Sequence, residues 1–302
     1  MNGLADSRYR LLKRLGRRHT SQVWLADKLS PQGTALRTVA LKTMAVDSSA
    51  ALENDARRRA ALFERETVVT ARLEHPNIVR LHDWGFDLFG STPFFEMGRV
   101  QGLSLLDLLT ARGGAERQGR RGALLPQDVA SIGMQAAAGL HYAHNHARLA
   151  RAEDRGLGIT SLTLEGVNGV AHGNLSAASV MVDVEGEVKL VDWSLARFLG
   201  TSDEASTHTC DDVFSLGATL NAALRGQESD PALKPLLDSM MHADREQRPR
   251  MDELVERFNG IVNLLDSDLY VARQGLAARV QEYYQEPRRR PRLRLIQGGA
   301  TP

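Results

Sequence analysis

Two short stretches in the second half of the chain restrict its fold more than any other part. The first, residues 171–181, reads AHGNLSAASVM, and the second, residues 188–194, reads VKLVDWS. Among their polar side chains, His172, Asn174, Ser179 and Asp192 stand at a fixed spacing. Residues in a fixed order of this kind form a motif. The fold that the motif indicates depends on the helices and strands predicted around it.

The composition permits a large globular fold. The chain has 302 residues, of which 42% are hydrophobic, enough for two lobes around a cleft or for one large domain. Its 38 basic residues nearly balance 37 acidic ones, so no overall field favours nucleic acid. Cys210 is the single cysteine, which excludes an intrachain disulfide. No apolar run approaches the ~18 residues that cross a bilayer, and the first residues lack a signal-peptide pattern, so we expect a cytoplasmic protein.

The two stretches resemble the signature of protein kinases, H-R-D-L-x-x-x-N followed by D-F-G. His172 and Leu175 agree with the first part, and Asp192 agrees with the second. The flanking motifs described below follow in the order that the family shows, over residues 8–260. The resemblance is to the bacterial type of serine/threonine protein kinase.

The residues that carry the chemistry of the family are altered. Gly173 stands at the arginine, Asn174 at the catalytic aspartate and Trp193 at the phenylalanine of D-F-G. Ser176 replaces a lysine that reaches the γ-phosphate, and Ser179 replaces the magnesium-binding asparagine. In the family the catalytic aspartate accepts the proton of the substrate hydroxyl, and an amide cannot do so. The resemblance therefore implies degraded catalytic motifs.

The metal ligands that the resemblance implies are Asp192 and Ser179. The aspartate can hold one Mg²⁺, and the serine hydroxyl offers a neutral oxygen, which is a poorer ligand than the usual amide. Three nearby histidines, His141, His144 and His146, have neither cysteine nor carboxylate at ligand spacing, so we interpret them as helix-surface or core residues.

Residues 8–42 predict three strands joined by turns. Aligned with the glycine loop G-x-G-x-x-G-x-V, the glycine positions fall on Gly16, Arg18 and Ser21, with Val23 in register. One glycine of three remains. Glycines let backbone N–H groups approach the phosphates closely, so the two replacements should weaken phosphate contacts.

Residues 39–42, Val-Ala-Leu-Lys, resemble V-A-I-K, whose lysine contacts phosphates and pairs with a helical glutamate. A helical run over 51–73 precedes the turn that begins at His75. The spacing of nine residues to His75 favours Glu66 over Glu64 as the partner of Lys42. Taken separately, these would be ordinary surface charges, but their order favours the pair.

Residues 93–102 resemble the last strand of the small lobe and the linker after it. Met97 falls at the gatekeeper position, and Gly98 and Val100 fall where the backbone would bind an adenine edge. The apolar walls of this pocket would come from Val23, Ala40, Met97 and Met181, with Gly16 above the phosphates. We expect ATP to bind weakly, with modest dependence on Mg²⁺.

The region after Pro126 predicts a large helical lobe. One buried helix runs from Pro126 to His144, and residues 147–169 form an insertion that predicts a surface hairpin and a possible partner site. Only 20 positions separate Asp192 from Asp212, where the next helix is expected to open, and no Ala-Pro-Glu motif lies between them. The peptide-binding platform is therefore largely absent. Arg248 lacks its usual glutamate, so Asp203, Glu204 or solvent would have to replace it.

The C-terminal end predicts one further helix over 262–285 and then a basic tail. Residues 287–302 are rich in proline and arginine and are expected to be disordered. Such a run can bind nucleic acid or an acidic surface, although a solvated tail is the default interpretation.

We therefore expect an α+β chain with the bilobal protein-kinase fold: a small antiparallel sheet with one helix, and a larger, mainly helical lobe. The expected parts are the N-lobe (8–97), the C-lobe (98–261), the last helix (262–286) and the tail (287–302). Three functions stay open. They are a pseudokinase that signals or scaffolds by binding a protein partner, a slow or atypical serine/threonine kinase using Lys42, Glu66 and Asp192, and a purely structural fold.

Overall fold

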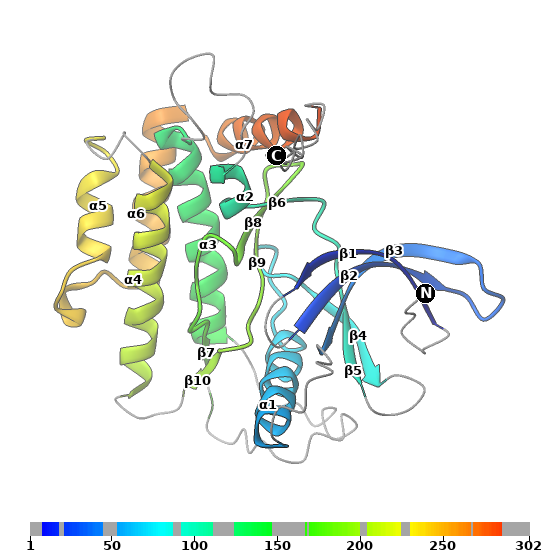
Figure 1. Ribbon diagram of the computed structural model, residues 1–302. Coiled ribbons are helices and arrows are strands. Elements are labelled where there is room, and N and C mark those ends of the chain that lie inside the picture. Colours follow the sequence, from blue (N-terminus) through cyan, green and yellow to red (C-terminus); the bar gives the residue numbers. More distant parts are fainter. Residues whose placement is uncertain are drawn as a thin grey trace, which may run out of the picture.

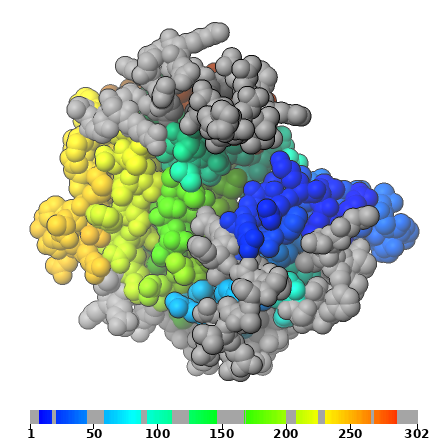
Figure 2. All heavy atoms as spheres, viewed as in Figure 1, coloured from blue at the N-terminus to red at the C-terminus, as the bar shows by residue number. Residues whose placement is uncertain are grey.

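The computed structural model describes residues 8–17, 21–44, 53–86, 92–110, 124–146, 167, 169–199, 204–224, 230–266 and 268–285. These residues form two lobes, a sheet with one helix and a larger helical part (Figure 1). The strands of the first lobe project from the helical part in the space-filling view (Figure 2). The predicted α+β bilobal fold is confirmed. The predicted insertion hairpin and basic tail, and the predicted role of Arg18, lie outside the described residues.

The N-lobe is one antiparallel sheet of five strands in the order β1-β2-β3-β5-β4. The strands are β1 (Tyr9–Arg17), β2 (Ser21–Leu29), β3 (Ala35–Met44), β4 (Leu81–Phe86) and β5 (Pro93–Met97). The predicted turn between β2 and β3 is present, because the Gly33 N–H donates to the Ser30 carbonyl and Gly33 has a φ of 80°. Glycine adopts this angle without steric cost.

The two faces of this sheet are covered differently. On one face α1 (Glu53–Thr70) packs through Phe63 against Phe95, with ring centroids 5.1 Å apart. On the other face, the fully buried carboxylate of Glu96 accepts hydrogen bonds from Tyr9 at 2.8 Å and Lys28 at 2.8 Å. The second face also holds a hydrophobic cluster that includes Tyr9, Leu41 and Phe94. The helix on the first face lies beside β3, which positions the site described below.

The C-lobe is built around α3, which contacts α4, α6 and α7 (Figure 1). Its helices are α2 (Leu105–Thr110), α3 (Pro126–His146), α4 (Glu204–Leu224), α5 (Lys234–Met240), α6 (Met251–Asp266) and α7 (Leu269–Gln285). A Cβ on Gly133 of α3 would lie 2.6 Å from the Phe258 ring, so glycine is required where α6 crosses α3. A 3-10 turn, Arg245–Gln247, precedes α6.

Two small sheets carry the motif-bearing loops. β6 (Gly102–Ser104), β8 (Val180–Asp183) and β9 (Val188–Leu190) form one, and β7 (Gly169–Ala171) pairs with β10 (Arg197–Leu199) in the other. The loop with His172 and Asn174 therefore lies between β7 and β8, and Asp192 lies between β9 and β10.

Two predicted helix spans are wrong. The run 262–285 is not one helix, because α6 continues to Asp266 and α7 begins at Leu269. The helix expected to open at Asp212 begins eight residues earlier, at Glu204. Only two residues separate α6 from α7, so the apolar pattern did not reveal that break, and the first two turns of α4 are polar in sequence, so apolar periodicity did not predict them.

Arg248 has partners that the sequence analysis did not predict. Its guanidinium donates to the carbonyls of His242 and Cys210 at 2.9 and 3.0 Å, and it lies 3.6 Å from the Asp211 carboxylate. Asp211 is thus an acidic neighbour of Arg248, while the expected partners, Asp203 and the side chain of Glu204, lie outside what the structure describes. The first turns of α4 bring Asp211 to this position because the helix starts early.

Candidate functional site

Three charged side chains from distant segments meet between the lobes. Lys42 Nζ on β3 lies 2.6 Å from Glu66 Oε1 on α1 and 3.0 Å from Asp192 Oδ1 after β9. All three side chains are buried, with exposed fractions of 5%, 4% and 8%. The predicted contact of Lys42 with Glu66 is present, and Asp192 completes the cluster.

The two carboxylates decide the charge state of this cluster. Burial acts to lower the pKa of Lys42, but the charges of Glu66 and Asp192 outweigh it and the pKa is raised. Lys42 therefore stays protonated at neutral pH and holds two anions in the interior. Removing the cation alone would leave both carboxylates buried without it, which is the costly way to break such a cluster.

Asp192 is held in a special backbone conformation, with a φ of 68°. The next residue, Trp193, is fully buried, and its ring centroid lies 4.5 Å from that of His172. Before it, the Val191 N–H donates to the Ser179 carbonyl at 2.9 Å. The Trp193–His172 packing ties the carboxylate of Asp192 to the loop after β7.

Asp212 on α4 fixes the loop after β7 through the backbone. Its carboxylate accepts hydrogen bonds from the N–H groups of His172 at 2.7 Å and Gly173 at 2.9 Å, and it lies 2.9 Å from His144 Nε2. Burial acts to raise the pKa of Asp212, but His144, His172 and the Gly173 N–H outweigh it and the pKa is lowered. His144 is therefore a core histidine, as predicted. The anchoring role of Asp212 was not predicted from the sequence, although its place in the run Asp-Val-Phe-Ser-Leu-Gly is a usable signal.

Glycine at position 173 suits this loop. Gly173 has a φ of 69°, and a Cβ there would lie 2.5 Å from the Leu195 carbonyl oxygen. A side chain at this position would be both strained and crowded. The arginine of the family signature is thus replaced by the residue that this backbone accommodates best.

Ser179, the predicted second metal ligand, makes hydrogen bonds within its own loop. Its Oγ accepts from the Ser176 N–H at 2.9 Å and lies 3.1 Å from the Ser176 carbonyl, and the residue is fully buried. The hydroxyl is thus used inside the loop. No group of three or more His, Cys, Asp and Glu side chains that could hold a metal occurs in the described part of the chain. Asp192 is the carboxylate that a Mg²⁺ would use.

Sheet register aligns the predicted walls of the nucleotide pocket. Val23 is opposite Lys42 across β2 and β3, and Ala40 is opposite Met97 across β3 and β5. Met181 on β8 is partly buried. Gly16 is exposed, and a Cβ added there would have no heavy atom within 4 Å.

The linker after β5 leaves suitable backbone groups for an adenine edge. The Gly98 N–H donates to the Arg80 carbonyl at 2.9 Å, which fixes the linker against β4. Among the described residues, no backbone hydrogen bond engages the Val100 N–H. The donor that the resemblance assigns to adenine is thus available, and the residues present fit this part of a nucleotide.

The segment that would carry a peptide substrate is very short. β10 ends at Leu199 and α4 begins at Glu204, so four residues separate the strand from the helix. In the family an extended platform occupies this place. The early start of α4 shortens the segment beyond what the sequence predicted.

Fold and site together define a protein-kinase-like chain. A "Probable serine/threonine-protein kinase" of Streptomyces coelicolor is 31% identical over 205 residues, 67% of this chain and 24% of that protein. PrkC of Bacillus subtilis is 26% identical over 68% of this chain, and PknB of Mycobacterium tuberculosis is 24% identical over 81%. The chain is thus a relative of the bacterial serine/threonine protein kinases.

The similarity covers only part of these relatives. The chain spans 25% of the length of PrkC and 36% of that of PknB. No protein-family model matches the chain. No helix in the part of the chain that the structure describes is long and apolar enough to cross a membrane.

Proposed function

We propose that this chain is a pseudokinase that binds ATP weakly, transfers phosphate very slowly or not at all, and acts in signalling by binding a protein partner. The observation that carries the proposal is Asn174 at the position of the catalytic base. A carboxylate there accepts the proton of the attacking hydroxyl, and a neutral amide has no lone pair basic enough for that task.

Retained groups support nucleotide binding. Lys42 supplies a charge-assisted contact to phosphate worth about 1.5–3 kcal/mol, and the linker from Gly98 to Val100 supplies backbone contacts to adenine. Asp192 would hold a Mg²⁺, which would neutralise charge on the phosphates when bound. Ser179 Oγ is already hydrogen-bonded to the Ser176 backbone, which would make it a weak second ligand. Weak binding with modest metal dependence follows from this combination.

Calorimetry with the purified chain tests this part of the proposal. We expect ATP binding that Lys42→Ala weakens by about tenfold, the loss of one charge-assisted contact, and that EDTA reduces only in part. Radiolabelled ATP with a generic protein substrate should give no transfer above background. The proposal of nucleotide binding fails if millimolar ATP gives neither heat nor a thermal shift.

A slow or atypical serine/threonine kinase is the second candidate. It is favoured by the buried cluster of Lys42, Glu66 and Asp192, whose two ion pairs measure 2.6 and 3.0 Å. Phosphorylation by the unmodified chain that Lys42→Ala abolishes would favour this candidate over the pseudokinase.

A further inference from the structure

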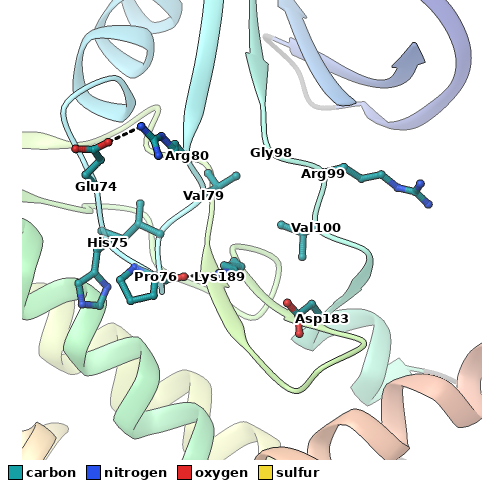
Figure 3. Close-up of a pocket in the computed structure, with 11 residues that line it drawn as sticks. Glu74, His75, Pro76, Val79, Arg80, Gly98, Arg99, Val100, Asp183 and Lys189 are labelled. Carbon is teal, nitrogen blue, oxygen red and sulfur yellow. Dashed lines mark hydrogen bonds and ion pairs between the residues drawn. The ribbon is translucent and has the colours of Figure 1, made fainter. Parts of the chain in front are cut away.

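The linker after β5 is fixed at its two ends and borders a cavity along its middle. At the first end, the Gly98 N–H donates to the Arg80 carbonyl at 2.9 Å. At the far end, the Gln101 carbonyl accepts from the Val184 N–H at 2.9 Å. Between these bonds, Val100 lines a cavity of about 530 Å³ beside the linker (Figure 3). A segment beside open space moves more readily than a packed one, so the position of the linker depends on how firmly its ends are held.

The last turn of α7 adds a contact at the far end of the linker. Tyr284 donates its hydroxyl to the Gly102 carbonyl at 2.9 Å, next to the bond at Gln101. Gln281, nearly one turn earlier in α7, donates its side-chain N–H to the Val184 carbonyl at 3.0 Å. Gly102 opens β6, and Val184 follows its antiparallel partner β8. Helix α7 therefore bonds to both sides of the strand pair that continues the linker (Figure 1).

The body of α7 is packed into the C-lobe. Ala272, Leu276 and Val280 form its buried face, and each is at most 1% exposed. The turn between β8 and β9 approaches the helix backbone so closely that a Cβ on Gly186 would overlap the Arg273 carbonyl oxygen. Glycine is required at such an approach. The helix is thus fixed against the turn that follows β8, and this fixes the place from which its last turn reaches the linker.

Two ion pairs connect α7 to separate elements of the C-lobe. Arg273 Nη2 lies 2.6 Å from Glu187 Oε1 at the start of β9, and Arg279 Nε lies 2.6 Å from Asp128 Oδ2 on α3. Asp128 is buried and also accepts from the Leu125 N–H at 2.7 Å, before the first turn of α3. Helix α7 is therefore held on two sides, by the β8–β9 turn and by the central helix of the lobe.

The last turn of α7 differs from the body of the helix because it is exposed. Residues 281–285 are all exposed, and Tyr284 keeps 51% of its surface accessible. The ring of Tyr283 packs edge-on against that of Tyr284, with centroids 5.8 Å apart. A change of Tyr284 to phenylalanine therefore removes the hydroxyl that reaches Gly102 and leaves the buried core untouched.

We propose that Tyr284 is a positioning residue for nucleotide binding, because its hydrogen bond to Gly102 fixes the far end of the linker whose backbone would meet adenine. This inference rests on the proposed function and deepens it, since it assigns part of the support of the same site to α7. Backbone groups bind a flat base well only when they are already ordered, because ordering them on binding costs free energy.

The phosphate side of the site is held by other elements. Lys42 on β3 lies 2.6 Å from Glu66 on α1 and 3.0 Å from Asp192 after β9. The hydroxyl of Tyr284 takes no part in this cluster. Its loss should therefore weaken the contacts to adenine and leave the contacts to phosphate unchanged.

Calorimetry on the full chain, with ATP and with inorganic tripolyphosphate, separates these two sides. Tyr284→Phe should weaken ATP binding about fivefold, the weight of one neutral hydrogen bond, and leave tripolyphosphate binding unchanged. Lys42→Ala should weaken both ligands. The matched control is Tyr270→Phe, at a residue of the same helix that is 71% exposed, and it should change neither. Equal losses for the two ligands in Tyr284→Phe, or a loss of ATP no larger than in the control, would overturn the proposal.

Hydrogen exchange without nucleotide tests the effect on the linker by itself. Peptides that cover residues 98–104 should exchange up to about fivefold faster in Tyr284→Phe than in the unmodified chain, because one bond that resists local opening is gone. Peptides from the middle of α3 should exchange as before. Unchanged exchange over 98–104 would show that the hydrogen bond does not hold the linker, and would reject the positioning role.

Failure of this inference is distinguishable from failure of the proposed function. If the unmodified chain binds no ATP, the proposed nucleotide binding and the role of Tyr284 in it are both wrong. If ATP binds equally to the unmodified chain and to Tyr284→Phe, the proposed function stands and only the role of Tyr284 is rejected.

Discussion

The two sides of the candidate site have been preserved to different degrees. On the nucleotide side, Lys42 joins Glu66 and Asp192 in one buried cluster. On the acceptor side, the loop keeps its anchors to Asp212 but carries Asn174 at the position of the base. Asp212 binds N–H groups that nearly any residue supplies, so the loop can hold its shape after its catalytic side chains are lost.

This difference shows that fold and chemistry depend on different atoms of the same loop. Backbone donors of His172 and Gly173 maintain the architecture, whereas the side chain of residue 174 would perform catalysis. In the cluster of Lys42, Glu66 and Asp192, the same side chains hold the fold and would bind the nucleotide. They are buried, so their charges must balance one another.

Breaking the nucleotide cluster should have the largest effect. Lys42→Met leaves Glu66 and Asp192 buried without their cation, and we expect a loss of about 3–5 kcal/mol in the free energy of unfolding. Urea denaturation followed by circular dichroism measures it. Lys13→Met on the exposed part of β1 is the matched control and should change stability little. A loss below about 1 kcal/mol in Lys42→Met would contradict the tight coupling of this cluster.

Restoring the arginine of the signature should also destabilise the chain. Gly173→Arg places a side chain at a φ of 69° and 2.5 Å from the Leu195 carbonyl, so we expect a loss of about 1–3 kcal/mol. Gly260→Ala in α6, where a Cβ meets no atom within 4 Å, should instead stabilise by about 0.5–1 kcal/mol. If both variants shift the urea midpoint alike, the loop is less constrained than its backbone indicates.

The acceptor-side loop should make stability fall in mild acid. Burial lowers the pKa of His172 below its unfolded value near 6.5, so the folded state binds fewer protons there. The neutral imidazole contributes its full stability above about pH 6.5. That contribution is lost as the pH falls below this value, by about 1.4 kcal/mol for each pH unit by which the folded pKa lies below the unfolded pKa. Asp212, whose pKa is also lowered, adds a further loss below about pH 4.

Denaturation at pH 7.5, 6.0 and 5.0 checks this expectation. His172→Gln keeps a polar side chain that does not titrate, and the decline between pH 7.5 and 5.0 should become shallower than in the unmodified chain. An identical slope in the variant would assign the pH dependence to other groups, such as His75 and His82, whose pKa values are lowered too.

The variant with the smallest expected effect is the most direct test of the acceptor side. Asn174→Asp restores the base but neither Ser176 nor Ser179 nor the short segment before α4, so phosphoryl transfer should stay at background. Stability should change by no more than about 0.5 kcal/mol, because the residue is only partly buried and its N–H contact to His172 is unaffected. Measurable transfer to a generic protein substrate would show that the base is the single missing part.

Sequence alone predicted the bilobal fold and the contact of Lys42 with Glu66. Both follow from the order and spacing of motifs along the chain, and such order survives when individual catalytic residues change. Local pattern also predicted the strand and turn before β3 and the long helix from Pro126. These elements depend on apolar periodicity and turn residues that are encoded within a few positions.

Only the tertiary structure decided the remaining features. The hydroxyl of Ser179 is used by Ser176 within its own loop, and α4 begins early enough to bring Asp211 to Arg248. A cavity beside the linker after β5 likewise brings together Glu74, Arg99 and Lys189, which no local pattern connects. The physical reason is that hydrogen-bond partners and cavities are set by which segments pack together, whereas sequence periodicity determines only the elements that pack.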